Sequence, residues 1–263
     1  MSEFFLEVKG ISKSFPGVQA LDDVNFSVRR GEIHVLCGEN GAGKSTLMKI
    51  LDGIHKADSG QILIDGKPVE INSPRDARRY GIAMIFQECA YVPEMSIAEN
   101  LFLGNLPVNA LHQVDWKYIY KKTEDLLVSE NFTENTKFEN GVHTKLKNLS
   151  ISDIQMLEII KAISKGSQVL IMDEPTSSLA QKETDMLLKK VIELKNRGKS
   201  IIYISHKMDE IFKIADQITI FRDGKVVCSK PASDLSIDEV ITLMVGRKLS
   251  NNYPKETVEI GRR

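Results

Sequence analysis

The chain has 263 residues, of which 42% are hydrophobic and 27% are charged, and its formal net charge is −1. This composition is typical of a globular protein with one large domain or a domain with a subdomain, and the scattered Lys and Arg residues exclude the basic stripe that marks nucleic-acid or anionic-membrane binding. No apolar run approaches the ~18 residues that cross a bilayer, and the first residues lack the features of a signal peptide. Three widely spaced cysteines, an odd number, favour free thiols in a reducing cytosol, so we expect a cytoplasmic chain.

The N-terminal part of the chain predicts antiparallel strands. Residues 6–8 and 24–28 alternate between apolar and polar side chains with a period of two, as half-buried strands do. A third short strand, residues 61–64, ends at Asp65-Gly66, which is a hairpin turn signal. These segments predict a small antiparallel sheet.

A glycine-rich loop lies between the short apolar run 33–37 and the helical-looking segment 46–51. Glycines let successive backbone N–H groups converge on an anion without interference from Cβ atoms, and the helix N-terminus adds positive potential. Lys44 would reach the β- and γ-phosphate oxygens, and the Ser45 hydroxyl would be a ligand for Mg²⁺. The alternative, an ordinary glycine-rich turn, does not require this order of strand, loop and helix. We predict a nucleoside triphosphate site formed by Gly38, Glu39, Asn40, Gly41, Ala42, Gly43, Lys44, Ser45 and Thr46.

The segment after the first hairpins returns to the central sheet. Ser73 and Pro74 predict the start of a short helix that ends at Gly81. The apolar residues 82–86 then predict a buried strand that places Gln87 at its end.

Residues from about 88 to 166 predict a helical subdomain inserted between two strands of the sheet. Residues 96–99 read Ser-Ile-Ala-Glu, which is a capping box at a helix start. Asp115 is expected to cap a helix that runs to about residue 127, and residues 150–163 are helical again.

Strands and helices alternate through the rest of the chain, which predicts a parallel sheet with helices on its faces. The predicted strands are residues 169–173, 200–205, 218–221 and 225–228, and the predicted helices are residues 181–197 and 208–215. From residue 247 onward the sequence is polar without apolar periodicity. We expect an α/β fold with a mixed central parallel sheet, an antiparallel β subdomain and the inserted helical subdomain over residues 1–246, followed by a tail or linker, residues 247–263.

Polar residues stand at the ends of three predicted sheet strands. Asp173 can hold Mg²⁺ through water, and Glu174 can orient an attacking water or accept its proton. Gln87 offers an amide to Mg²⁺ and to that water, and His206 can donate to a γ-phosphate. A lone His or Gln at the end of a buried strand more often has a structural role. Polar residues at the ends of three strands, beside the phosphate loop, favour a role in binding or catalysis. The expected catalytic residues are Lys44, Gln87, Glu174 and His206, and the expected Mg²⁺ ligands are Ser45, Gln87 and Asp173.

With these motifs the chain resembles the ATPases of ATP-binding cassette (ABC) transporters, which are P-loop NTPases, over nearly its whole length. In that family's terms Phe15 looks like the aromatic residue that stacks on adenine, and core packing beside Pro16 is the alternative. Gln87 looks like the glutamine of the hinge between subdomains. Residues 173–174 look like the second nucleotide motif with its catalytic carboxylate, and His206 looks like the switch histidine.

The resemblance is closer to one subfamily. Segments 10–21, 173–179 and 203–211 are similar to the first cassette of monosaccharide importers of the ribose, galactose and xylose type. This implies a subunit at the cytoplasmic face of the cell membrane that binds and hydrolyses ATP with Mg²⁺ and energises sugar import. The implied partners are a second ABC cassette, fused or homodimeric, a transmembrane sugar permease and an extracytoplasmic sugar-binding protein, with no nucleic acid. The apolar residues 91–93 and Met95 are candidates for the groove that receives a permease helix, and ordinary subdomain core is the alternative.

The chain departs from the family at its signature, Leu-Ser-Gly-Gly-Gln, which here reads Leu-Ser-Ile-Ser-Asp at residues 149–153. In the family this signature completes the ATP site of the opposite cassette, so Ser150 and Ser152 are expected to bind its nucleotide. Ser152 adds a Cβ and a hydroxyl donor, whereas Asp153 would repel phosphate if it pointed inward. Ala180 stands where the family usually has Asp or Thr, which removes a polar link across the dimer. We therefore expect two unequal ATP sites, with the slower one completed by this signature.

Two other functions stay open. A regulatory cassette that binds ATP with little hydrolysis would be consistent with Asp153, although intact Glu174 and His206 argue against it. A soluble ABC ATPase that acts on DNA or ribosomes would need a long coiled-coil insertion or a basic linker, and the sequence shows neither.

Overall fold

The computed structural model describes residues 3–86, 90–132 and 140–246 of the chain. In chain order its main elements are β1 (Phe4–Phe15), β2 (Val18–Arg29), β3 (Ile33–Gly38), α1 (Lys44–Leu51), β4 (Ser59–Ile64), β5 (Lys67–Val69), α2 (Pro74–Arg79), β6 (Ile82–Ile85), α3 (Ile97–Phe102), α4 (Trp116–Ser129), α6 (Ile151–Ser164), β7 (Val169–Asp173), α7 (Gln181–Asn196), β8 (Ser200–Ile204), α8 (Met208–Ile214), β9 (Gln217–Arg222), β10 (Lys225–Pro231) and α9 (Ile237–Val245). Within these described ranges no helix is both long and apolar enough to cross a membrane.

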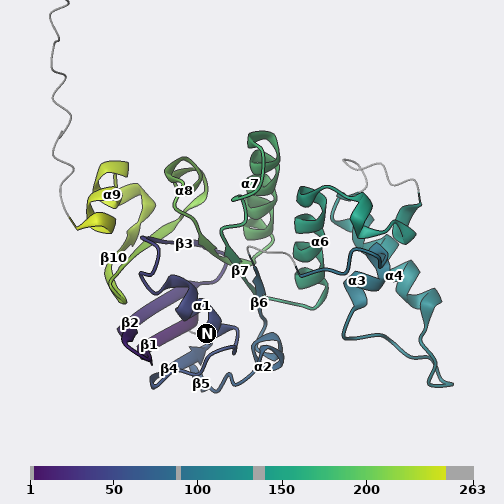
Figure 1. Cartoon of the computed structure of the whole chain (residues 1–263), viewed down its shortest axis with the longest axis horizontal. Coiled ribbons are helices and arrows are strands. Elements are labelled where there is room, and N and C mark those ends of the chain that lie inside the picture. Colours follow the sequence, from purple (N-terminus) through teal and green to yellow (C-terminus); the bar gives the residue numbers. More distant parts are fainter. Residues whose placement is uncertain (1–2, 87–89, 133–139, 247–263) are drawn as a thin grey trace, which may run out of the picture.

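Two sheets organise the fold (Figure 1). The smaller, antiparallel sheet has the strand order β2-β1-β4-β5, and the larger sheet has the order β10-β9-β3-β8-β7-β6. Neighbouring strands of the larger sheet are parallel except β10, which pairs antiparallel with β9. The carboxyl ends of β3, β8, β7 and β6 therefore meet at one edge. The predicted α/β fold, with a mixed central sheet and an antiparallel subdomain, is confirmed.

Apolar side chains cover both faces of the larger sheet, as a mostly parallel sheet requires. In β3, Leu36 belongs to the apolar cluster shared with the antiparallel sheet and α1. Val35 and Cys37 belong to the cluster on the other face, which α7, α8 and α9 complete. This alternation follows from the period of two along a strand, and it holds the end of β3 between two packed layers.

Helices α3, α4 and α6 follow β6 and precede β7, and they form the part of the molecule on the right of Figure 1. They share an apolar cluster of their own, with Leu101 from α3, Ile119 from α4 and Leu157 from α6. Helix α6 also packs on the larger sheet through Ile159. The predicted inserted helical subdomain is confirmed, and α6 connects it to the central sheet.

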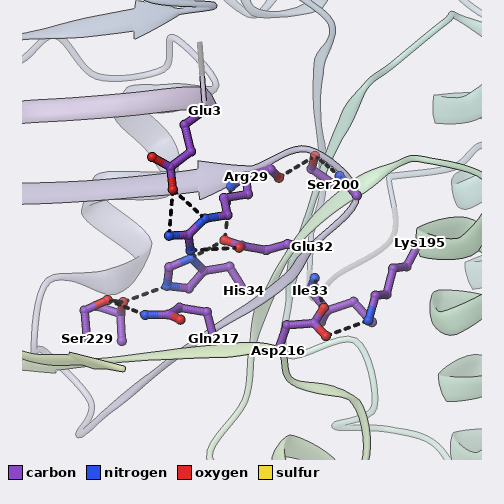
Figure 2. A network of polar contacts seen from close by, with 12 residues as sticks. Glu3, Arg29, Glu32, Ile33, His34, Lys195, Ser200, Asp216, Gln217 and Ser229 are labelled. Carbon is purple, nitrogen blue, oxygen red and sulfur yellow. Dashed lines mark hydrogen bonds and ion pairs between the residues drawn. The ribbon is translucent and has the colours of Figure 1, made fainter. Parts of the chain in front are cut away.

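A network of polar contacts joins the two sheets where β2 leads into β3 (Figure 2). Glu32 Oε1 accepts a hydrogen bond from the Arg29 backbone N–H at 3.1 Å and lies 2.9 Å from His34 Nδ1. His34 Nε2 in turn lies 2.7 Å from Oγ1 of Thr219 in β9, and the Arg29 guanidinium donates to Glu3. Burial alone would raise the pKa of Glu32, but the hydrogen bonds and charges of His34 and Arg29 bring it below its ordinary value.

The structure differs from the sequence predictions in two places. β1 and β2 are each 12 residues long, well beyond the predicted segments, because they pair with each other along their whole length. Helix α9 was not predicted, although Ser236 and Glu239 form a capping box at its start. The predicted tail or linker, residues 247–263, lies outside the described residues.

Candidate functional site

The predicted phosphate loop lies between β3 and α1. Gly43, the N-cap residue of α1, has φ +103°, and a Cβ at this position would lie 2.6 Å from the carbonyl oxygen of Ala20. A Cβ on Gly38 would collide with the carbonyl oxygen of Phe221. Glycine is required at both positions because neighbouring backbone approaches so closely.

Lys44 begins α1, and its ammonium group is held inside the loop. Nζ donates to the carbonyl oxygens of Gly38, at 2.8 Å, and Glu39, at 3.0 Å. Burial lowers the pKa of Lys44, an effect that the carboxylates of Glu174 and Asp173 oppose. Since an ammonium group has three donors, one remains for an anion beside the loop.

A cavity of about 130 Å³ opens beside this loop. It is lined by residues 40–46, by Asp173 and Glu174 at the end of β7, and by Ile204 at the end of β8. The Ser45 hydroxyl hydrogen-bonds the Asp173 carboxylate. Burial raises the pKa of Asp173, and the charge of Glu174 raises it further, so a cation bound here would favour the ionised form.

Glu174 and His206 face each other at the ends of two neighbouring strands. His206 Nδ1 lies 3.1 Å from Glu174 Oε1. Glu174 has the left-handed φ of +44°, a conformation that costs a non-glycine residue about 1–3 kcal/mol and that concentrates at functional sites. Its backbone N–H donates to the carbonyl oxygen of Ile204 at 3.0 Å, which fixes this turn against β8.

Glu210, on α8, is buried, and the sequence analysis assigned it no role. Its Oε2 accepts hydrogen bonds from Thr176 Oγ1 at 2.7 Å and from Tyr203 Oη at 3.0 Å. The sequence carries little signal for this, because Asp209 and Glu210 both stand in the first turn of α8, where exposed carboxylates are common. A buried carboxylate needs such donors.

Phe15 ends β1 and is 37% exposed. Its ring meets His55 edge-on with ring centroids 5.3 Å apart, and Lys13 Nζ lies 5.6 Å from the ring centroid. The alternative that Phe15 packs into the core is wrong, because the ring is partly open to solvent. Phe15 does not line the phosphate-loop cavity, so this residue lies apart from the carboxylates.

The signature segment forms the N-terminus of α6. Ser150 is the N-cap residue, and it forms a capping box with Asp153, whose Oδ2 accepts from Ser150 Oγ at 2.7 Å. Ser152 Oγ donates to Glu183 Oε1 at 3.0 Å, and Glu183 Oε2 accepts the Ala180 backbone N–H, also at 3.0 Å. The Asp153 carboxylate is therefore turned back onto its own helix, and the signature is connected to the start of α7.

The structure thus brings together part of the predicted site. The residues that meet at the cavity or next to it are Asn40, Gly41, Ala42, Gly43, Lys44, Ser45, Thr46, Asp173, Glu174 and His206. Gly38 and Glu39 hold the Lys44 ammonium group from the other side of the loop. Ser150 and Ser152 do not line this cavity. Gln87 lies outside the described residues, so its place stays a prediction.

The donors at the cavity fit a Mg²⁺ ion that is bound together with phosphate. Among the described residues, no cluster of three or more His, Cys, Asp or Glu side chains could hold a metal ion by itself. Ser45 and Asp173 supply a hydroxyl and a carboxylate oxygen, which are ligands that Mg²⁺ prefers. Mg²⁺ usually completes its shell with water and substrate phosphate oxygens, so two protein ligands are sufficient.

Comparison with known proteins places this site in a family. The family model described as ABC transporter matches residues 21–177 of the chain, which include the phosphate loop and residues 173–174. The chain belongs to the ABC transporter family. The crystal structure of the ADP conformation of an ATP-binding cassette of an ABC transporter has the same fold, with a TM-score of 0.76 and 25% identity over 93% of this chain and 96% of that one.

Two relatives within the ABC transporter family extend the comparison. The xylose import ATP-binding protein of Thermoanaerobacter pseudethanolicus is 47% identical over 257 residues, which are 97% of this chain and 50% of that protein. The galactose/methyl galactoside import ATP-binding protein of Clostridium tetani is 48% identical over 256 residues, which are 96% of this chain and 50% of that protein. The chain spans about half the length of the curated relatives it matches.

Proposed function

We propose that this ABC cassette binds and hydrolyses ATP to energise the import of a monosaccharide across the cell membrane. The observation that carries the proposal is the cavity beside residues 40–46, where Lys44, Asp173 and the facing pair Glu174 and His206 meet. The sugar is inferred from the relatives, whose names describe import of xylose and of galactose.

Each residue at the cavity has a role in this proposal. The N–H groups of residues 40–46 and the Lys44 ammonium group would bind the phosphates, and because the backbone fixes these donors they need no reorganisation during the reaction. Glu174 would orient the attacking water and accept its proton, and His206 would donate to the γ-phosphate. Ser45 and Asp173 would hold Mg²⁺, which supplies neutralisation of phosphate charge.

Two further contacts to ATP and its metal are proposed. Phe15 would stack on adenine, since its side chain is 37% exposed and an aromatic ring offers a flat apolar surface to a base. Gln87 would offer its amide to Mg²⁺ and to the attacking water.

A second cassette, fused or homodimeric, would complete the ATP site. Ser150 and Ser152 would contact the nucleotide held by that partner, and the Ser152 hydroxyl would have to leave Glu183 in order to donate to a phosphate. ATP that contacts both cassettes would hold them together until it is cleaved, and this shift between closed and open pairs would drive transport. Unequal rates at the two sites stay a prediction.

A permease is expected to dock on a groove of about 310 Å³ between α2, β6 and α6. Its lining combines apolar side chains, Met84 and Phe86 among them, with the charged Arg78 and Lys165. The predicted segment 91–93 and Met95 do not line this groove, and Tyr91 packs on the apolar cluster of the helical subdomain instead. We place the cassette, residues 1–246, at the cytoplasmic face of the membrane, with residues 247–263 as a linker and an extracytoplasmic sugar-binding protein as the third partner.

The Glu174→Gln variant tests the proposed hydrolysis. The variant should bind Mg-ATP as tightly as the wild type, because Gln keeps the shape of the side chain, but its hydrolysis should fall by about 100-fold or more through loss of the base. Equilibrium binding and phosphate release from the full chain measure the two effects. Glu70→Gln, which changes an exposed carboxylate next to β5, is the matched control. Equal hydrolysis by Glu174→Gln and the wild type would contradict the assignment, and ATP binding without hydrolysis in either would favour a regulatory cassette.

A further inference from the structure

A buried carboxylate on α8, that of Glu210, takes no part in the proposed chemistry. Glu210 is only 5% exposed, and both of its oxygens are occupied. Oε2 accepts from Thr176 Oγ1 at 2.7 Å and from Tyr203 Oη at 3.0 Å, and it lies 3.4 Å from Ser205 Oγ. Oε1 pairs with Lys207 Nζ at 3.1 Å. Burying an ionised carboxylate is expensive unless it is paired and hydrogen-bonded, so these donors make its place in the interior tolerable.

One side of this network holds the segment that follows Glu174. Thr176 is buried, its hydroxyl donates to Glu210, and its carbonyl oxygen accepts from Lys207 Nζ at 2.9 Å. The Ser177 backbone N–H donates to the Glu174 carbonyl oxygen at 3.1 Å and closes the turn. The left-handed backbone of Glu174 is therefore held on its C-terminal side by Thr176.

The other side of the network holds the residues on both sides of His206. Ser205 Oγ accepts the Lys207 backbone N–H at 3.1 Å, and both residues contact Glu210 through their side chains. The His206 side chain itself is 60% exposed. Because little packs on the imidazole, its direction depends on the backbone at residues 205 and 207.

We propose that Glu210 is a positioning residue that ties the segment 174–177 to the segment 205–207 and so sets the distance between the Glu174 carboxylate and the His206 imidazole. It does not line the cavity, so it would act on ATP hydrolysis only through those two side chains. The effect of Glu210 on hydrolysis rests on the proposed function. The contacts through which Glu210 holds the two segments together are also present without nucleotide.

Two variants weaken the contacts through which Glu210 holds the two segments together, and a third variant is the control. Glu210→Gln keeps the size of the side chain but removes its negative charge. The amide NH₂ group of Gln is itself a donor, so it cannot accept the hydrogen bonds that one carboxylate oxygen of Glu210 accepts. Thr176→Val removes the hydroxyl that donates to Glu210 and leaves the contacts of Glu210 with Tyr203 and Lys207, so it serves if Glu210→Gln does not fold. The hydrogen bond from Lys207 to the Thr176 carbonyl oxygen is kept in this variant. Asp209→Asn changes an exposed carboxylate one residue away on α8.

Hydrogen exchange of the nucleotide-free full chain tests the tie without ATP. Peptides that cover residues 174–180 and 203–208 should exchange about 5-fold faster or more in both tie variants, because the hydrogen bonds of these turns open more often. Peptides from β1 should be unchanged, and Asp209→Asn should behave as the wild type. Unchanged exchange of both turns in Glu210→Gln and Thr176→Val would overturn the proposal.

Single-turnover hydrolysis at saturating Mg-ATP tests the catalytic consequence. Thr176→Val should slow hydrolysis about 10-fold and change the ATP dissociation constant by less than about 2-fold, since misplacement of catalytic groups affects the reacting state and not the binding. In a His206→Ala background the same substitution should slow hydrolysis by less than about 3-fold, because changes that act through one pair are not additive. Equal losses in the two backgrounds would overturn the positioning role. If the wild type does not hydrolyse ATP, that result would count against the proposed function. Hydrogen exchange would still test whether Glu210 holds the two segments together.

Discussion

Asp52, at the C-terminal end of α1, shows at the scale of one residue how burial changes the behaviour of a carboxyl group. The residue is 6% exposed, and burial raises its pKa to about 6, with Arg78 acting in the opposite direction. A carboxyl group whose pKa is higher in the folded state than in the unfolded state is easier to bury when protonated. Its ionisation therefore lowers stability as the pH rises from about 4 to about 6, and the loss persists above that range.

The Asp52→Asn variant should remove this loss. At pH 7 its free energy of unfolding should exceed that of the wild type by up to about 3 kcal/mol, and the difference should shrink toward zero near pH 4. Urea unfolding at a series of pH values measures it, with the exposed Asp209→Asn variant as the control. A difference that does not change between pH 4 and pH 7 would show that Asp52 is not the group responsible.

A second prediction at the residue scale concerns Gly43. Its φ of +103° and the nearby Ala20 carbonyl oxygen both oppose a side chain, so Gly43→Ala should lower the free energy of unfolding by about 2 kcal/mol more than Gly198→Ala. Gly198 also has a positive φ, +83°, but a Cβ there meets nothing within 4 Å, so it reports the cost of the backbone conformation alone. The prediction fails if urea unfolding gives the two variants the same loss.

At the scale of elements, a buried group of charges joins the end of α4 to α7. Glu130 accepts from both Arg197 nitrogens, at 2.7 and 2.8 Å, and pairs with Lys190 at 2.9 Å. The side chains of Glu130 and Lys190 are almost fully buried, whereas Glu94, which pairs with Lys145 and Lys147, is 66% exposed. We therefore expect the buried contacts of Glu130 to have a large effect on the free energy of unfolding and the exposed contacts of Glu94 to have a small one.

Substitution of each carboxylate by the amide tests this difference. Glu130→Gln should lower the free energy of unfolding by about 3 kcal/mol, because it leaves the Lys190 ammonium group buried with less compensating charge. Glu94→Gln should change it by less than about 1 kcal/mol. Comparable losses in the two variants, measured by urea unfolding at the same salt concentration, would contradict this account.

The elements also show what the sequence can and cannot reveal. The helix starts at Ser73 and Ser96 were predictable, the first from Ser followed by Pro and the second from a capping box, and the structure agrees at both. The orientation of Asp153 was not predictable, because the same residue type can cap its own helix or face a ligand. The contact of Thr176 with Glu210 could not be read either, since it joins residues 34 positions apart through tertiary packing.

At the scale of the whole molecule, the order of strands in the larger sheet brings the predicted site residues together. Parallel strands end at one edge, so placing Asp173 and His206 at the ends of β7 and β8 was enough to predict that they approach the phosphate loop. The sequence could not give the exposure of Phe15, which depends on how β1 meets the residues around His55. The chain spans about half the length of the curated relatives it matches.

The binding of Mg-ATP by Lys44→Ala, compared with the wild type, tests the central claim most directly. Lys56→Ala, which removes an exposed lysine beyond the end of the same helix, is the control, and thermal unfolding of both variants checks the fold. We predict that Lys44→Ala weakens equilibrium binding by about 100-fold or more, which corresponds to about 2.7 kcal/mol, while Lys56→Ala binds as the wild type does. Wild-type affinity in a folded Lys44→Ala variant would contradict the account.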